Sequence, residues 1–566
     1  MDESTGRLRW LRIPSVMAAI GLVVAACGTT QTSNNNPNNM ASNDKQILRT
    51  NTNTEPNSFD PGQETYDYEI TLGHNIFEPL LKPTKDLKDV TGAAASSWEV
   101  SSDGLTYTFH LRQNAKWSDG QPVKAQDFVY GWQRVLDPTL AAGYADPFFD
   151  GTVKGGEKYS KVDTKDKAAV QSYIQALGLA APDDHTFKVT LQQPAGYFKW
   201  IATLWLSAPI RKDVVDKYGY DKWSSTPTNV ISNGPWKIQE EVPKDHITLV
   251  PNPNYWGDKP HIQKWTDYFI EDLNQAFSKY QTGELDVVNI PLANADLVKS
   301  GTPLSKEFKK VPQLDTFWIA MNLTKPPFDN VKVREAVSRA VDRNALVNDV
   351  AKGFYIARQT FIPLGMNGYK PSLGSAQDYD PAKAKAALQA SGVPTSAIDK
   401  VKLLTRNTTT NKQLNEFIVN QINTNLGVHW TLDVIDSKTV TTNLRKGNFQ
   451  IYGPDGWGAD YPDQQDWFDI FTTGGCHGTN WGCWNNKDFD ALVTKADQAT
   501  KESERQSLYD QAQQMLEDQY IVAFLYHRPA PVLVKPYVQG VTNIAIDSAI
   551  YLPGETYSTT IYIANH

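Results

Sequence analysis

The sequence predicts a mixed α/β protein of several lobes, preceded by a segment for export. Three observations lead to this fold class. The chain has 566 residues, enough for two or three domains of ordinary size. Short segments with a strand pattern alternate with longer segments that have a helical pattern. We find no internal repeat, so the elements belong to a mixed α/β or α+β architecture rather than to a solenoid.

The periodicity of apolar residues locates the individual elements. A strand begins at residues 47–50, and apolar and polar positions alternate over 107–111 and 187–191, as in half-buried strands. Asp329 is a plausible N-cap for a helix. Apolar residues at helical spacing then form three stripes, which we interpret as core faces: Val333, Ala336, Val337, Ala340 and Val341; Phe489, Leu492, Val493 and Ala496; and Leu508, Ala512, Met515 and Leu516.

The first 26 residues have the pattern of a signal peptide. Three arginines precede an apolar stretch over residues 13–26, and roughly 14 apolar residues are too few for the ~20 that span a bilayer. Val24-Ala25-Ala26-Cys27 resembles the bacterial lipobox, in which the cysteine is lipidated and becomes the mature N-terminus. The alternative is an ordinary signal peptide with an incidental cysteine. Residues 27–46 then form the lipidated cysteine and a flexible polar tether.

The composition limits the possible partners. The net charge is −8 and no run of basic residues follows the signal, so we expect no nucleic-acid partner. Aromatic residues make up 11% of the chain, which suits a large core and also a cavity that holds flexible ligands between flat surfaces. The sequence indicates no cofactor, and we expect a monomer. Two sequons, Asn322-Leu-Thr and Asn407-Thr-Thr, are incidental in a bacterial lipoprotein.

Two cysteines remain if Cys27 is lipidated. Cys476 and Cys483 are seven positions apart in a glycine-rich loop, and in an oxidising compartment they favour a disulfide. The alternative is a metal site that also uses His477. Three ligands in one loop are too few for a closed zinc site, so we expect no metal.

A family resemblance follows from one long motif and several shorter ones. Residues 103–128 include Tyr-Thr-Phe-His-Leu-Arg-Gln-Asn-Ala-Lys-Trp117-Ser-Asp-Gly120 and resemble the signature of the peptide/nickel family of extracytoplasmic solute-binding proteins, the receptors of ABC importers. Supporting motifs are Asn57-Ser-Phe-Asp60-Pro61, Ile76-Phe-Glu78-Pro-Leu80-Leu, Asn233-Gly234-Pro-Trp236, Asn252-Pro-Asn-Tyr255-Trp256, Asn330-Val-Lys-Val-Arg334-Glu-Ala-Val, Trp132-Gln-Arg-Val-Leu136-Asp-Pro138 and Gly456-Trp457-Gly-Ala-Asp460-Tyr461. The last two are similar to the oligopeptide-binding branch.

This resemblance implies a type II periplasmic-binding-protein fold, with two lobes that close on a ligand and an extra inserted domain. The implied boundaries are 47–77, 208–311 and 528–566 for lobe I, 78–207 for the inserted domain and 312–527 for lobe III. The implied function is an extracytoplasmic, lipid-anchored receptor that binds oligopeptides and delivers them to the permease subunits of an ABC transporter. It performs no chemistry itself.

A receptor that ignores peptide sequence has to bind the groups that all peptides share, namely the main chain and the charged ends. By resemblance, Asp460 occupies the position of the aspartate that binds the α-ammonium group of the peptide. Gly456, Trp457 and Tyr461 would line the neighbouring pocket. The alternative for Asp460 is a solvated acid in the turn Asp-Tyr-Pro-Asp.

The resemblance also implies residues on the opposite wall and a partner for the peptide carboxylate. Thr65, Tyr66 and Asp67 align with a segment that pairs with the peptide main chain. The other implied contacts are a second contact strand at Asn233 and Gly234, an aromatic ring from Tyr526 or His527, and a carboxylate partner at Arg445, which is equally well explained as a surface arginine.

The chain departs from the family pattern where cations are expected. Asn411 replaces a histidine, although Arg406 or Lys412 could substitute, and Pro454 or Asp455 replaces another cation. The partner of the ligand carboxylate, and with it the preferred peptide length, is therefore left open. An extra acid at Asp455 could instead favour basic peptides.

Two other functions are compatible with parts of the sequence, namely binding of a different solute and hydrolysis. The same scaffold could bind another solute, such as a nickel chelate, haem, glutathione, an opine or an oligosaccharide, although the nine histidines form no ligand spacing for a metal. A secreted hydrolase could use Asp460 and Asp463 as paired carboxylates. The sequence contains neither His-Glu-x-x-His nor a Gly-x-Ser-x-Gly elbow, so we expect no enzymatic activity.

Overall fold

The computed structural model of the protein describes residues 39–357, 360–541 and 555–566. The chain divides into two units, Met1–Asn34 and Asn35–His566, and the description below concerns the second. The predicted signal peptide, Cys27 and most of the predicted tether lie outside the described residues. Among the described residues, no helix combines the length and the apolar character that crossing a bilayer requires.

The prediction of a flexible tether up to residue 46 is wrong for its last part. Residues 39–46 belong to the folded body, because Met40 forms a β-bridge with Ala564 and Ala41 donates its N–H to the carbonyl of Ile563. Gln46 is fully buried, and its side-chain amide donates to the carbonyls of Ala41 and Ile563. The C-terminal segment supplies hydrogen-bond partners for backbone groups that, judged from the polar composition of residues 39–46 alone, would be expected to bind water.

Lobe I is built on a four-stranded sheet of order β1-β10-β9-β8, in which β1 runs parallel to β10. A three-stranded sheet of order β11-β19-β12 and the pair β20-β21 complete its strands. Its elements are β1 (Ile47–Thr52), α1 (Asp67–Ile76), α6 (Lys212–Tyr218), β8 (Trp236–Val242), β9 (His246–Pro251), β10 (Lys264–Phe269), α7 (Leu273–Gln281), β11 (Val287–Asn289), β12 (Phe308–Val311), β19 (Ala530–Val534), β20 (Val538–Gln539) and β21 (Tyr562–Ile563).

The inserted domain is an antiparallel sheet of order β4-β5-β7-β6 covered by α2, with the ring of Trp132 lying 5.2 Å from that of Phe187. Its apolar residues and those of lobe I form one continuous core, so the insertion is not an independently packed body. Its elements are β2 (Leu81–Pro83), β3 (Val90–Gly92), β4 (Ala95–Val100), β5 (Thr106–Leu111), α2 (Ala125–Leu136), α3 (Gly156–Ser160), α4 (Lys167–Ala176), β6 (Leu179–Asp183), β7 (Thr186–Thr190) and α5 (Phe198–Ile201).

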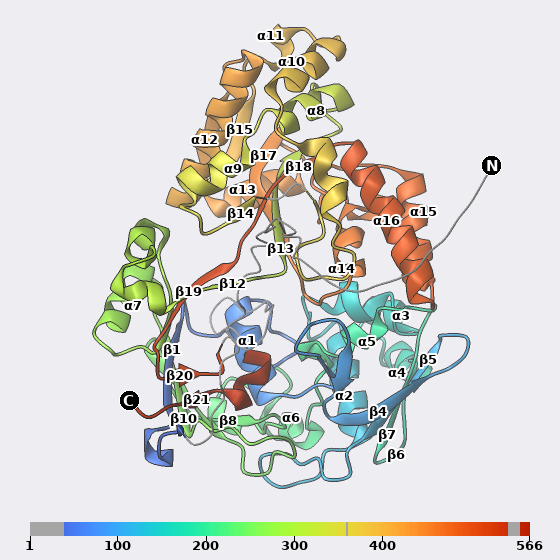
Figure 1. Cartoon of the computed structure of the whole chain (residues 1–566). Coiled ribbons are helices and arrows are strands. Elements are labelled where there is room, and N and C mark those ends of the chain that lie inside the picture. Colours follow the sequence, from blue (N-terminus) through green and yellow to red (C-terminus); the bar gives the residue numbers. More distant parts are fainter. Residues whose placement is uncertain (1–38, 358–359, 542–554) are drawn as a thin grey trace, which may run out of the picture. The chain divides into compact units, whose positions relative to one another are not determined.

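Lobe III has a six-stranded mixed sheet of order β14-β18-β13-β17-β15-β16 with helices on both faces (Figure 1). Successive residues of β13 alternate between two cores, because Trp318 packs with α14–α16 and Ile319 packs with α8, α10 and α12. Its elements are β13 (Asp315–Met321), α8 (Val331–Arg339), α9 (Arg343–Ala345), β14 (Ile356–Ala357), α10 (Pro381–Ala390), α11 (Thr395–Ile398), β15 (Lys402–Arg406), α12 (Thr409–Leu426), β16 (Thr431–Ile435), α13 (Ser437–Arg445), β17 (Ile451–Gly458), α14 (Gln465–Phe468), α15 (Lys487–Gln498), α16 (Glu502–Asp518) and β18 (Val522–His527).

Two crossing segments connect the sheets of lobes I and III. One leads from β12 to β13 and the other from β18 to β19; β12 pairs with β19, and β13 pairs with β18, each antiparallel. Each described sheet draws its strands from only one of the three predicted regions. The exact domain boundaries stay a prediction.

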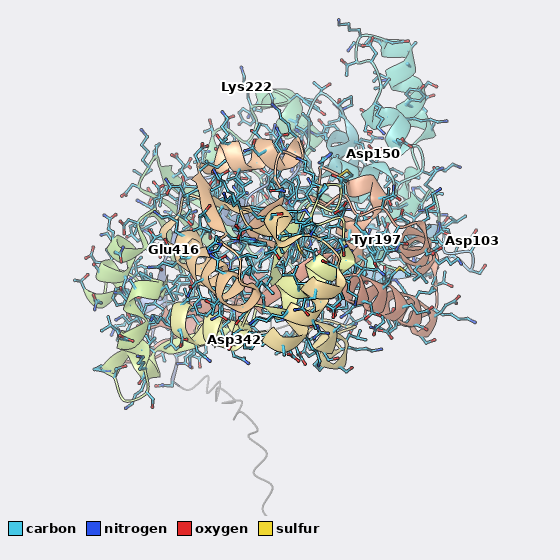
Figure 2. The ribbon with its side chains drawn as sticks, turned by 90° about the horizontal axis from the view of Figure 1, so that it is seen from above. Asp103, Asp150, Tyr197, Lys222, Asp342 and Glu416 are labelled. Atoms are coloured by element: carbon cyan, nitrogen blue, oxygen red, sulfur yellow. A yellow bond between two sulfur atoms is a disulfide. The ribbon has the colours of Figure 1, made fainter. Side chains whose placement is uncertain are left out.

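The inserted domain also contacts the C-terminal helices of lobe III. Gly196 donates its N–H to the carbonyl of Asp497 at 3.1 Å, and Gln498 donates to the side chain of Gln193 at 2.9 Å. Figure 2 labels Tyr197, a buried residue of this contact. The inserted domain and lobe III are therefore in contact at a second place, separate from the two crossing segments.

The predicted elements are confirmed. The strands expected near residues 47–50, 107–111 and 187–191 are β1, β5 and β7, and the three apolar stripes lie on α8, α15 and α16, except that Ala340 and Val341 follow the end of α8 and are buried there. One detail differs, since the N-cap of α8 is Asn330, whose side chain accepts from the N–H of Lys332, rather than Asp329. The predicted fold class, a mixed α/β two-lobed protein with an inserted domain, is also confirmed.

Candidate ligand-binding site

Three adjoining cavities lie where the lobes face each other. The central cavity, of about 350 Å³, is bounded by α1 on one side and by the start of β13 and the end of β17 on the other. A smaller, mainly apolar pocket of about 90 Å³ shares Asp460 and His74 with the central cavity. A third cavity of about 450 Å³, here called the far cavity, shares Phe317, Gly456 and Arg528 with it.

Asp460 lies at the boundary between the central cavity and the apolar pocket. The strand β17 ends at Gly458, and the next residue donates its N–H to the carbonyl of Leu314, which fixes the chain that carries Asp460. The N–H of Asp460 donates to Oδ2 of Asp466 at 3.0 Å. Burial, and secondly the charge of Asp67, raise the pKa of Asp460 to about 7.

Two further carboxylates surround Asp460. Asp67 is the first residue of α1; its side chain reaches water, yet the cavity walls desolvate it enough to raise its pKa, an effect that Arg528 opposes. Asp466 is buried, and burial together with the charge of Asp460 raises its pKa well above the ordinary value. The described residues give the carboxylate of Asp460 no hydrogen-bond donor, so this end of the cavity has unbalanced negative charge.

A positive charge lies where the central cavity meets the far cavity. Arg528 lies in the crossing segment between β18 and β19, and its N–H donates to Oδ1 of Asp315 at 2.6 Å. Its Nε lies 3.4 Å from Oδ2 of Asp315, and its guanidinium lies 4.7 Å from the ring centroid of Phe317. Burial is the largest single influence on the pKa of Arg528 and lowers it, but Asp315 and the weaker contributions of Tyr355, Tyr526 and Asp67 together raise the pKa.

His74 of α1 lies beside the acidic end. Its side chain is half-buried and lines both the central cavity and the apolar pocket, and its two ring nitrogens are buried without a hydrogen-bond partner among the described residues. Burial lowers the pKa of His74 to about 4, so the ring is neutral at neutral pH. A neutral imidazole offers one donor and one acceptor to a bound molecule.

Some predicted site residues come together in these cavities. Gly456, Trp457 and Asp460 line the central cavity with Asp67, and Tyr461 lines the apolar pocket. The indole of Trp457 donates to Oδ2 of Asp466 at 3.3 Å, which holds its ring beside the acidic cluster.

Four other predicted contacts are used inside the protein. The N–H groups of Thr65 and Tyr66 donate to Oε2 of Glu69 and cap α1, so they are not available to pair with a ligand in this structure. Asn233 is fully buried and forms two hydrogen bonds with the backbone of Glu78. Gly234 donates its N–H to the carbonyl of Ile76, and a Cβ at this position would lie 2.8 Å from the backbone there.

Of the remaining predicted residues, one lines a cavity, one is buried outside the three cavities and one is at the surface. Tyr526 lines the far cavity and stacks on Phe317 at 5.1 Å. His527 points away from the described cavities, with Nδ1 lying 2.6 Å from the carbonyl oxygen of Asp315. Arg445 is exposed at the end of α13 and lines none of the three cavities.

Arg528, Asp315, Asp466 and His74 were missed by sequence reasoning. Only one of them had a usable signal: Arg528-Pro529 follows a hydrophobic strand and therefore marks the end of that strand. Arg406, which was considered as a substitute cation, lines the far cavity, where Asp455 also lies; burial raises the pKa of Asp455 to about 7.

The cysteine loop is separate from these cavities. A disulfide joins Cys476 to Cys483, with their Cα atoms 4.5 Å apart. The side chain of His477 lies with them within 4.8 Å, which is the arrangement that the alternative metal site required. Both sulfur atoms are bonded to each other here, so in the oxidised protein they do not supply thiolate ligands.

Comparisons with known proteins agree with this architecture. The model of the middle region of bacterial extracellular solute-binding proteins, family 5, matches residues 89–478. The periplasmic oligopeptide-binding protein OppA of Salmonella typhimurium is 31% identical over 544 residues, which cover 94% of this chain and 96% of that protein. The probable deoxycholate-binding periplasmic protein YgiS of Escherichia coli is 28% identical over 528 residues, covering 92% and 94%.

Solved structures show the same fold. The unliganded open form of the periplasmic murein tripeptide-binding protein MppA matches with a TM-score of 0.76 and 28% identity, over 93% of this chain and 98% of that one. A two-lobed α/β fold with a cavity between the lobes thus defines the class as a solute-binding protein. More specifically, the chain belongs to family 5 of the bacterial extracellular solute-binding proteins. Membership of this family is consistent with the expectation that the protein is not an enzyme.

Proposed function

We propose that this protein binds peptides with a free amino terminus in the central cavity and that Asp460 binds their α-ammonium group. The observation that carries the proposal is a carboxylate in an inter-lobe cavity that has other carboxylates as neighbours and no hydrogen-bond donor among the described residues. Such a group is costly to keep ionised unless a cation joins it, and a peptide ammonium group supplies that cation.

The composition of the cavity walls supports a peptide as the ligand that supplies this cation. The boundary residues Asp460 and His74 connect the polar central cavity with the apolar pocket, so a ligand held at Asp460 has room for a main chain on one side and a side chain on the other. The relative OppA is named for oligopeptide binding and MppA for murein tripeptide binding, which fits this ligand class.

An anionic solute fits the acidic end less well. YgiS is named as a probable deoxycholate-binding protein, and deoxycholate carries a carboxylate at neutral pH. Asp67 and Asp460, in their ionised forms, would repel that charge in a cavity that water screens poorly. Among the alternatives, neutral sugars would leave the same carboxylates unpaired.

The cellular role follows from the family and from the export signal. We infer an extracytoplasmic, lipid-anchored receptor that hands its peptide to the permease subunits of an ABC transporter. Lipidation at Cys27 predicts that the wild-type protein partitions with membranes and that a Cys27→Ala variant does not. Recovery of the variant in membranes to the same extent would reject the anchor.

Calorimetry with matched peptides tests the binding proposal. Free tripeptides to pentapeptides should bind, and their N-acetylated forms should bind at least tenfold more weakly, because acetylation removes the ammonium charge. Asp460→Asn should remove this difference. Asp497→Asn is the matched control, because Asp497 is a carboxylate of similar burial and pKa (about 7) that accepts a hydrogen bond from Tyr509 and lies outside the cavities. Equal affinity of free and acetylated peptides for the wild type would reject the proposal.

A further inference from the structure

The central cavity is lined by charges of both signs. Asp460 lies at its boundary with the apolar pocket and Arg528 at its boundary with the far cavity, and of the described residues that line the central cavity Arg528 is the one lysine or arginine. Asp67 and Arg528 influence each other's pKa, which places both charges within the same electrostatic environment. A molecule with a cation at one end and an anion at the other matches this arrangement better than a molecule with a single charge.

Part of the guanidinium of Arg528 is available to a ligand. Its Nε faces Asp315, and one face of its plane covers the ring of Phe317. Among the described residues, no hydrogen bond is formed by its two terminal NH₂ groups, and 40% of its side chain is exposed. The planar fork of an arginine suits a carboxylate, which can accept two parallel hydrogen bonds from it.

Three other cations, Lys82, Arg406 and Arg445, are engaged, distant or in a neighbouring pocket. Lys82 lines the apolar pocket and not the central cavity, and its ammonium group lies 5.3 Å from the ring centroid of Tyr557. Arg406 donates from Nε to the hydroxyl of Tyr452 at 3.0 Å and from a terminal nitrogen to the carbonyl of Ser437 at 3.1 Å. Arg445 is on the surface at the end of α13 and lines none of the three cavities. Arg528 is therefore the cation that a ligand in the central cavity meets.

The place of Arg528 in the fold adds a mechanical consequence. The residue lies in one crossing segment, between β18 and β19, and its hydrogen bond and ion pair to Asp315 connect it to the other crossing segment at the start of β13. It also marks the boundary between the central and far cavities. An anion bound to Arg528 would thus contact the connection between the lobes, where closure has to take place.

We propose that Arg528 binds the terminal carboxylate of a short peptide whose ammonium group is bound by Asp460. This inference rests on the proposed function, and it names the ligand class more narrowly: zwitterionic peptides that end within the central cavity. Longer peptides would have to pass Arg528 and continue into the far cavity. Peptides with a blocked carboxyl end lose the charge that Arg528 recognises.

The test uses the full-length protein and an alanine series from dialanine to penta-alanine. The length that binds most tightly is compared with its C-terminal amide by calorimetry. In the wild type the amide should bind at least tenfold more weakly than the acid. In Arg528→Gln the acid and the amide should bind equally, whereas the surface variant Arg445→Gln should keep the wild-type ratio.

The ratio of acid to amide is taken within each variant, so a general loss of affinity cancels. Arg528→Gln leaves buried Asp315 without its cation and could fold poorly. Arg528→Lys is therefore a second variant, which keeps the charge but loses the two parallel donors of the guanidinium group. Its ratio of acid to amide affinity should lie between the wild-type ratio and one. Equal acid and amide affinity in the wild type, or an unchanged ratio in both Arg528 variants, would overturn the inference while leaving ammonium binding intact. If no peptide of the series binds the wild type, the proposed function fails and the inference with it.

Discussion

Lowering the pH from 8 to 5.5 perturbs the proposed ammonium site directly. In the ligand-free protein, burial and Asp67 raise the pKa of Asp460 to about 7. Above that pH the carboxylate is ionised and can bind an ammonium group. Below it, a proton occupies the site, and the peptide has to displace this proton in order to bind.

The size of the effect follows from this pKa. If the bound ammonium group keeps Asp460 ionised throughout the range, protonation of Asp460 lowers affinity by the factor 1 + 10^(pKa − pH), which is about 2 at pH 7 and about 30 at pH 5.5, or roughly 2 kcal/mol. At pH 8 about half of the free peptide α-amino groups are uncharged, so the expected fall in affinity from pH 8 to pH 5.5 is about 15-fold. The other titratable groups near Asp460 modify the curve. Asp67 and Asp466 also have raised pKa values and add to the slope to the extent that they titrate in this range, whereas His74, with a pKa of about 4, stays neutral, and the pKa of Tyr144 is raised far out of the range.

Calorimetry of a free tripeptide at pH 8, 7 and 5.5 measures this dependence. Repeating the titration at pH 7 in two buffers with different ionisation enthalpies reports the protons released on binding, which we expect to be near one half. Asp460→Asn should flatten most of the curve, and Asp497→Asn should leave it unchanged. An affinity that varies less than about threefold between pH 8 and 5.5 would refute the assignment of Asp460 as the ionised partner.

Three further predictions concern stability. Arg134→Met should lower the free energy of unfolding in urea by about 3–5 kcal/mol, because it removes the ion pair at 2.8 Å and leaves Asp60 as a buried, unpaired charge. The double variant Arg134→Met/Asp60→Asn should lose less stability than Arg134→Met alone. Losses that add up in the double variant would contradict this prediction. Replacing Cys476 and Cys483 by serine should cost about 2 kcal/mol, since the closed loop is short; an unchanged urea midpoint would contradict it. The ligand-free protein should melt at a higher temperature at pH 6.5 than at pH 8. Burial raises the pKa of Asp267, Asp455 and Asp497 to about 7, so between these pH values the folded state binds protons that the unfolded chain does not bind. A lower melting temperature at pH 6.5 would contradict this prediction.

Elements with a strong period could be predicted from the sequence. The stripe on α8 packs against the six-stranded sheet of lobe III, and the alternation over β5 and β7 places Phe109 and Phe187 in the shared core of lobe I and the inserted domain. The folded conformation of residues 39–46 could not be predicted from the sequence, because it depends on contacts with Ile563 and Ala564, more than 500 positions away in the chain. Composition describes local preference and contains no information on such distant pairing.

The candidate site could be predicted only in part. The motif that contains Asp460 lies in the cavity, but Asn233 and Asp60, which stand in equally prominent motifs, are architectural. Asn233 binds the backbone of Glu78, and Asp60 forms a buried ion pair with Arg134. A motif shows that a residue type is required at a position, and it does not show whether the requirement comes from a ligand or from the fold.

Arg528 illustrates why the remaining part of the site was out of reach. No motif surrounds it, and its side chain enters the cavity only because β18 ends at His527 and the chain crosses between two sheets there. The opposite charges of the cavity thus come from three separate places: the start of α1, the loop after β17 and a crossing segment. In the proposed mode of binding, a ligand that bridges Asp460 and Arg528 would favour the separation of the lobes that matches its length. The length of the ligand and the degree of closure would then be coupled through these two side chains.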